Sequence, residues 1–154
     1  MNVEKFTQLL GHVTKKIAGK PIDKDLQDYL NEYFPPSSTL FKDIQSACSI
    51  GITEGWMCNY EHGGIKYGRV VKPCVDLNGF SVDVVEMNDC KGPHHSHPEG
   101  EIDMIMPIEG NPTFDGHPAG WLVHIVGSAH FPTVANGKAL VLYLLPNGKI
   151  EFTK

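Results

Sequence analysis

The sequence predicts a mainly β protein, in which a small antiparallel β-barrel of residues 51–154 carries an α-helical amino-terminal cap of residues 1–50. Residues 1–50 repeat their apolar positions at helical spacing, whereas the remainder divides into short β-type runs separated by glycine and proline. No helical segments alternate with these runs, which favours antiparallel over parallel strands. With 154 residues and a hydrophobic content of 41%, the chain is long enough to form one compact domain.

The helical cap is predicted from apolar residues that recur every three or four positions. In its first segment these residues are Val3, Phe6, Leu9, Leu10, Val13 and Ile17. In the second segment, "PIDKDLQDYLNEYF", an aspartate that can cap a helix precedes Leu26, Tyr29, Leu30 and Tyr33. The prolines and serines of "PPSS" at 35–38 then interrupt the chain and can cap a third helix through Leu40 to Ala47.

The predicted strands are the runs "IKYGRVV", "FSVDVVEM", "EIDMIMPI", "GWLVHIV", "ALVLYLL" and "KIEFT". The third run carries the strongest information about function, because side chains alternate between the two faces of a strand. If residues 101–108 form a strand, Glu101, Asp103 and Ile105 share one face. The other face then carries Ile102, Met104, Met106 and Ile108. One face is therefore largely acidic and the other is apolar.

The charge distribution argues against several classes of partner. The formal net charge is −5, and residues 81–115 hold eight acidic residues against one base, Lys91. Such a concentration of negative charge attracts cations and repels phosphates, so we expect no nucleic-acid partner. The longest apolar run, residues 139–145, is too short to span a bilayer, and the four cysteines form no CxxC pair. We therefore expect a cytoplasmic protein that does not associate with membranes.

Histidines and acids are concentrated in "GPHHSHPEGEIDMIMP", residues 92–107. His95 and His97 have the same parity as Glu101, so their side chains can converge inside a barrel, whereas His94 is expected to face solvent. Buried imidazoles beside a carboxylate require a compensating charge, and a divalent metal ion is the natural candidate. The alternative is a histidine-rich surface loop that binds nothing. Further along, "VGSAHFPTV" supplies His130 after a Gly-Ser turn.

The pattern HxHxxxE, followed by G-x-x-H on a later strand, resembles the two cupin motifs. The resemblance implies a cupin-like barrel and a divalent metal ion held by His95, His97, Glu101 and His130. It leaves the metal open among Fe, Mn, Ni and Zn. The chain departs from the cupin pattern at three positions: the motif-1 glycine arrives late, at Gly110, Ile125 stands where proline is common, and Val134 where asparagine is frequent.

A narrower resemblance extends over most of the chain. The string "GPHHSHPEGEID…FDGHPAGWLVHIVGSAHFPTV…ALVLYLLPNGKIEF", together with "KYGRVV" and "FSVDVVEM", is similar to the 4-hydroxylaminobenzoate lyase family. The resemblance implies conversion of 4-hydroxylaminobenzoate to 3,4-dihydroxybenzoate with release of ammonia, in nitroaromatic degradation. Its partner would thus be a small aromatic carboxylate.

The residue inventory suits this chemistry, which needs proton transfer and no external redox cofactor. Glu101 and Asp103, as like charges on one face, can have pKa values pushed apart and serve as acid and base, although Glu101 is also a candidate metal ligand. Arg69, the single arginine, is the best candidate to bind the substrate carboxylate, and Tyr67 shares its strand face. Arg69 has an alternative role, pairing with Asp83 or Glu86 on a neighbouring strand.

Other assignments stay open at the level of sequence. His124 lies in an apolar run and is expected to be a hydrogen-bonded core histidine. The same metal ligands would suit a metal-dependent dioxygenase or isomerase, and the fold would also suit a non-catalytic small-molecule-binding protein. We expect a homodimer, because small barrels often pair through edge strands.

Overall fold

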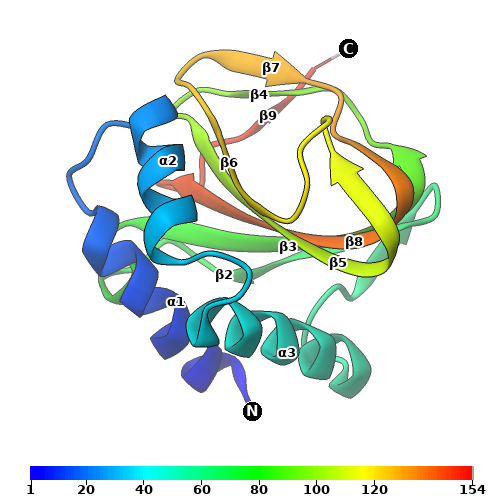
Figure 1. The fold of residues 1–154 in the computed structure, drawn as a ribbon, viewed down its shortest axis with the longest axis horizontal. Coiled ribbons are helices and arrows are strands. Elements are labelled where there is room, and N and C mark those ends of the chain that lie inside the picture. Colours follow the sequence, from blue (N-terminus) through cyan, green and yellow to red (C-terminus); the bar gives the residue numbers. More distant parts are fainter. Residues whose placement is uncertain (154) are drawn as a thin grey trace.

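The computed structural model describes residues 1–153, and its helices precede its strands along the chain (Figure 1). The helices are α1 (Val3–Ile17), α2 (Lys24–Tyr33) and α3 (Thr39–Glu54), with a short 3-10 helix at Val75–Leu77. The strands are β1 (Tyr60–His62), β2 (Ile65–Val71), β3 (Phe80–Lys91), β4 (His95–His97), β5 (Glu101–Phe114), β6 (Gly120–His124), β7 (Ser128–His130), β8 (Thr133–Pro146) and β9 (Glu151–Phe152). Each of the six predicted runs overlaps one of these strands, although two runs extend beyond β6 and β9, so the predicted mainly β fold with a helical amino-terminal region is confirmed.

The strands form two antiparallel sheets. The larger sheet has the order β1-β2-β3-β8-β5-β6, and the smaller has the order β7-β4-β9. Figure 1 shows the three helices against one side of the large sheet and the small sheet on its other side. The hydrogen bonding does not close the strands into one continuous barrel; the two sheets enclose the interior as in a jelly roll, which is compatible with the predicted architecture. None of the helices within residues 1–153 is long and apolar enough to cross a membrane.

The helices begin where side-chain caps are available. The Asp23 carboxylate accepts from the Leu26 backbone N–H at 3.0 Å, as predicted, and the Ser38 hydroxyl caps α3 by accepting from Phe41 N–H at 3.3 Å. Helix α3 continues to Glu54, beyond the predicted Ala47 and beyond the predicted boundary at residue 50. It ends at Gly55, whose φ of +85° lies in the left-handed region that glycine adopts readily. Gly51, in contrast, stays helical and lies against the Trp56 ring.

The large sheet separates two apolar clusters because its side chains alternate. On β5, Ile102, Met104 and Met106 are fully buried and belong to the cluster formed with the helices. Ile105 belongs to the second cluster, between the two sheets. As far as Met106, the predicted apolar face of this strand is therefore the face that packs against the helices. The acidic face points into the space between the two sheets.

Helix α2 fixes the edge strand β6 through polar contacts. The Asn31 side chain accepts from Trp121 N–H at 2.8 Å and donates to Trp121 C=O at 2.8 Å, and the Gln27 side chain accepts from Val123 N–H at 2.9 Å. Gly120 permits this close approach, because a Cβ at its position would lie 2.6 Å from Asn31 Oδ1. The helical cap thus holds in place the strand that ends at His124.

Candidate metal centre and adjoining cavity

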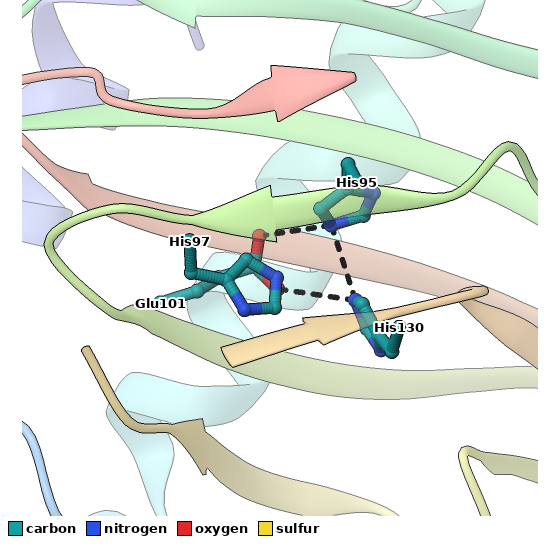
Figure 2. Close-up of side chains that lie close together, drawn as sticks. All are labelled: His95, His97, Glu101 and His130. Atoms are coloured by element: carbon teal, nitrogen blue, oxygen red, sulfur yellow. Dashed lines mark hydrogen bonds and ion pairs between the residues drawn. The ribbon is translucent and has the colours of Figure 1, made fainter. Parts of the chain in front are cut away.

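Four predicted residues converge between the two sheets. Their side chains, His95, His97, Glu101 and His130, point toward one another in Figure 2. On β4 the histidines alternate with Ser96, so both imidazoles are buried, while pairing of β4 with β7 sets His130 opposite His95. Glu101 begins β5 after a turn in which Gly100 has a φ of +91°. The sequence spacing HxHxxxE therefore places both histidines beside the carboxylate.

The ligand atoms of this cluster are close enough to share one ion. His97 Nε2 lies 3.2 Å from Glu101 Oε2, and His95 Nε2 lies 3.5 Å from Oε1. His130 Nε2 lies 3.1 Å from His95 Nε2 and 3.9 Å from Glu101 Oε2. One donor atom from each residue fits within 4.8 Å of the others. Three imidazoles and one carboxylate form a donor set suited to divalent transition metals.

Several polar atoms of the cluster are buried without a hydrogen-bond partner in residues 1–153. These atoms include both oxygens of Glu101 and Nε2 of His97. Burial disfavours the Glu101 carboxylate, but the close approach of the His95 and His97 imidazoles outweighs this effect and holds its pKa well below the usual range. An ionised, buried carboxylate surrounded by imidazoles attracts a cation. The cluster can therefore hold a metal ion.

Two neighbouring groups orient the imidazoles. The Ser128 hydroxyl donates to Ile125 C=O at 2.6 Å and lies 2.9 Å from His97 Nδ1, so it is placed to accept a hydrogen bond from Nδ1–H. His130 Nδ1 contacts the Asp115 carboxylate, which also accepts from Thr133 N–H at 2.9 Å. In both rings a proton on Nδ1 leaves the Nε2 lone pair facing Glu101. Neither Ser128 nor Asp115 can be assigned to the site from the sequence, because each lies on a different strand or loop from the ring that it contacts.

A second acid lies beside the cluster. Asp103 is fully buried, and burial together with the charge of Glu101 raises its pKa well above the usual value. His124 Nε2 lies 3.1 Å from Asp103 Oδ2, and burial lowers the pKa of His124 to about 4. The predicted separation of the Glu101 and Asp103 pKa values thus agrees with the structure. His124, expected as a core histidine, is largely buried, with 16% of its side chain exposed, and the β5–β6 register sets it opposite Glu101, beside the cluster.

A cavity of about 470 Å³ adjoins the cluster on the side of His95. It lies between the β2, β3 and β8 part of the large sheet and the β4–β9 side of the small sheet. Its walls are mainly apolar, with Ile65, Val85 and Met87 among them. Such a volume and lining are typical of pockets for small organic ligands.

Arg69 and Tyr67 both line this cavity. The Arg69 guanidinium also pairs with Asp83, which was the alternative interpretation of this residue: Nε donates to Asp83 Oδ1 at 2.8 Å and Nη2 to Oδ2 at 3.4 Å. Nη2 further donates to Gly148 C=O at 3.0 Å. Within residues 1–153, Nη1 donates no hydrogen bond, so the fixed guanidinium keeps donors for a ligand. Tyr67 is 41% exposed and stacks on Tyr60.

The cavity also reaches Tyr143, which the sequence analysis left within an apolar strand. Its side chain is buried, and burial together with the nearby carboxylates, Glu101 first among them, raises its pKa well above the usual value. The phenol therefore stays neutral. Tyr143 faces the same side of the sheet as Asp83 and Asp103 because it pairs with both, and this pairing cannot be read from the sequence.

Comparison with known proteins agrees with the narrower resemblance. The family model PnbB, described as 4-hydroxylaminobenzoate lyase, matches residues 8–152. A protein of Pseudomonas putida named 4-hydroxylaminobenzoate lyase is 30% identical over 154 residues, covering 89% of this chain and 88% of its own. A protein of the same name from Nocardioides sp. (strain LMS-CY) is 30% identical over 146 residues, with coverages of 89% and 86%. Among solved structures, an RmlC-like cupin protein from Ralstonia eutropha JMP134 aligns with a TM-score of 0.45 at 11% identity, covering 60% of this chain and 61% of its own.

The contact between Ser128 and His97 gives a prediction about metal affinity. Replacing Ser128 with Ala removes the acceptor that orients His97, and loss of such a partner costs roughly tenfold or more in metal affinity. Titration of bound metal against a competing chelator measures the change. Ser96→Ala, on the opposite face of β4, is the matched control. Equal affinities for the two variants would show that Ser128 does not orient a ligand.

Proposed function

Because the chain belongs to the 4-hydroxylaminobenzoate lyase family, we propose that it converts 4-hydroxylaminobenzoate and water into 3,4-dihydroxybenzoate and ammonia. The observation that carries this proposal is the extent of the family match. Residues 8–152 include every strand that supplies a side chain to the buried cluster and to the cavity beside it.

The cavity offers different chemistry at its two ends. At one end Arg69, held by Asp83, presents a planar cation that suits the carboxylate of the substrate. At the other end His95 connects the cavity to the buried cluster. The apolar walls between them suit a benzene ring. In this orientation the carboxylate lies near Arg69 and Tyr67, and the hydroxylamino group faces the cluster.

The donor set of His95, His97, Glu101 and His130 would hold a divalent metal ion, and Fe, Mn, Ni and Zn all suit it. When bound, the ion supplies Lewis acidity toward a hydroxylamino oxygen or an incoming water. His97 and His130 are fixed for this task by Ser128 and Asp115. The role of Glu101 as a metal ligand leaves Asp103 as the acid that can exchange protons.

The reaction releases one water and takes up two. The acidic and imidazole side chains beside the cluster can carry out the proton transfers that these steps need. First the N–O bond breaks as the leaving oxygen takes up a proton and departs as water, for which Asp103 is the proposed general acid. Water then adds to the ring carbon next to the C–N carbon, and neutral His124, 3.1 Å from Asp103, can accept a proton. A second water hydrolyses the resulting imine and releases ammonia, and transfer of the proton on the hydroxylated ring carbon to the new carbonyl oxygen restores the aromatic ring as 3,4-dihydroxybenzoate. The balance is one water consumed, with no external oxidant or reductant.

An oxygen-dependent dioxygenase would use the same cluster, so the decisive experiment excludes oxygen. Under anaerobic conditions the protein should release one ammonia and one 3,4-dihydroxybenzoate per 4-hydroxylaminobenzoate consumed, because the balance contains no O₂. Removing metal with a chelator should abolish turnover, and adding a divalent ion should restore it. A strict requirement for O₂ would instead favour a dioxygenase.

The homodimer and the cytoplasmic location stay predictions.

The proposed carboxylate site gives a second prediction. Arg69→Ala should raise KM for 4-hydroxylaminobenzoate roughly tenfold to a hundredfold, since a hydrogen bond to a charged group contributes about 1.5–3 kcal/mol. Lys66→Ala is the matched control, because Lys66 lies on the same strand and pairs with Glu86 at 3.9 Å instead. Steady-state kinetics of both variants measure the difference. An unchanged KM in Arg69→Ala would remove Arg69 from the substrate site.

A further inference from the structure

We propose that the Tyr143 hydroxyl donates a hydrogen bond to the nitrogen-bearing end of the substrate and thereby positions the group that lies para to the carboxylate. This inference rests on the proposed function and assigns a role to a residue outside the metal centre. It adds a second fixed point to the substrate site, in addition to Arg69.

The strand register places Tyr143 in a row of polar side chains. Arg69 on β2 pairs with Asp83 on β3, Asp83 pairs with Tyr143 on β8, and Tyr143 pairs with Asp103 on β5. Direct cross-strand partners present their side chains on the same face of a sheet, so all four face the interior. Neighbouring strands lie about 4.8 Å apart, which sets the backbones of Arg69 and Asp103 about 14 Å apart. Tyr143 lies between the proposed carboxylate anchor and the proposed acid.

The surroundings of Tyr143 leave its hydroxyl available to a ligand. The side chain is 5% exposed and lines the cavity, with its ring centroid 6.2 Å from that of His95 and 6.3 Å from that of Phe114. The two ring contacts fix the phenol. Within residues 1–153 its hydroxyl makes no hydrogen bond that meets ordinary geometric criteria, and it is not among the fully enclosed polar atoms that lack a partner. The hydroxyl is therefore accessible from the cavity and can donate to a ligand there.

The other tyrosines of the cavity are placed differently. Tyr60 and Tyr67 are 65% and 41% exposed, and their rings stack on each other with centroids 5.8 Å apart. Tyr67 also lies two residues from Arg69 on the same strand face, which assigns it to the carboxylate end. Tyr143 is the buried phenol, next to His95. With Arg69 fixed on the carboxylate, a donor at Tyr143 selects substrates whose para substituent carries an accepting atom.

Binding measurements with two stable benzoates test this role without requiring turnover. Tyr143→Phe keeps the ring and removes only the hydroxyl. Isothermal titration calorimetry should show that this variant binds 4-hydroxybenzoate about tenfold more weakly than the wild type does, and benzoate within about twofold, because benzoate has no para oxygen to lose a hydrogen bond. Tyr33→Phe, on the exposed end of α2, is the control and should leave both affinities unchanged.

The outcomes separate this inference from the proposed function. Equal losses for both ligands, or no loss for either, would overturn the role of Tyr143. Another outcome is that the wild type releases no ammonia from 4-hydroxylaminobenzoate while Tyr143→Phe selectively weakens binding of 4-hydroxybenzoate. In that case the proposed function fails, but the hydrogen bond from Tyr143 to the para substituent stands. A wild type that releases ammonia but binds neither benzoate would overturn the role of Tyr143 and leave the proposed function standing.

Discussion

The burial of two acidic side chains on one face of β5 is the constraint on which the rest of the interior depends. Glu101 and Asp103 are both fully buried, and an unpaired charge in such a position would cost several kcal/mol. Three imidazoles surround Glu101, and a fourth, that of His124, contacts Asp103. These imidazoles reduce the cost without removing it, because several of the polar atoms keep no hydrogen-bond partner within residues 1–153. The cluster can hold a metal ion, and a bound cation would offset the remaining cost of this interior.

The helical cap supports this costly arrangement from the other side of the sheet. Alternation along β5 buries Ile102, Met104 and Met106 against the helices, so the strand that carries both acids is anchored by its apolar face. Burial of each such side chain contributes about 1.5–3 kcal/mol, which helps to offset the cost of the acidic face. Asn31 and Gln27 of α2 fix β6 in the same way. The helices therefore act on the site through the sheet, and they lie on the side of the sheet away from the cavity.

Sequence reasoning predicted the parts of this protein that depend on local pattern. Parity predicted that His95, His97 and Glu101 converge, the resemblance to the cupin motifs implied that His130 joins them, and the runs separated by glycine and proline predicted the strands. What it missed depends on register between distant segments. His124 joins the site because β6 pairs with β5, and Tyr143 faces the cavity because β8 lies between β3 and β5. The residue that pairs with Arg69 was similarly undecided, since Asp83 and Glu86 lie on the same strand and only the register selects Asp83.

In the proposed orientation, one cavity holds an aromatic carboxylate with its acid group at Arg69 and its reacting end at the buried histidine cluster. A crystal structure of the metal-loaded protein with 3,4-dihydroxybenzoate would reveal this orientation. We expect the carboxylate within hydrogen-bond distance of the Arg69 guanidinium, and the two ring hydroxyls directed toward His95 and Tyr143. A product bound in the opposite orientation, with its carboxylate on the cluster and Arg69 free of ligand, would contradict it.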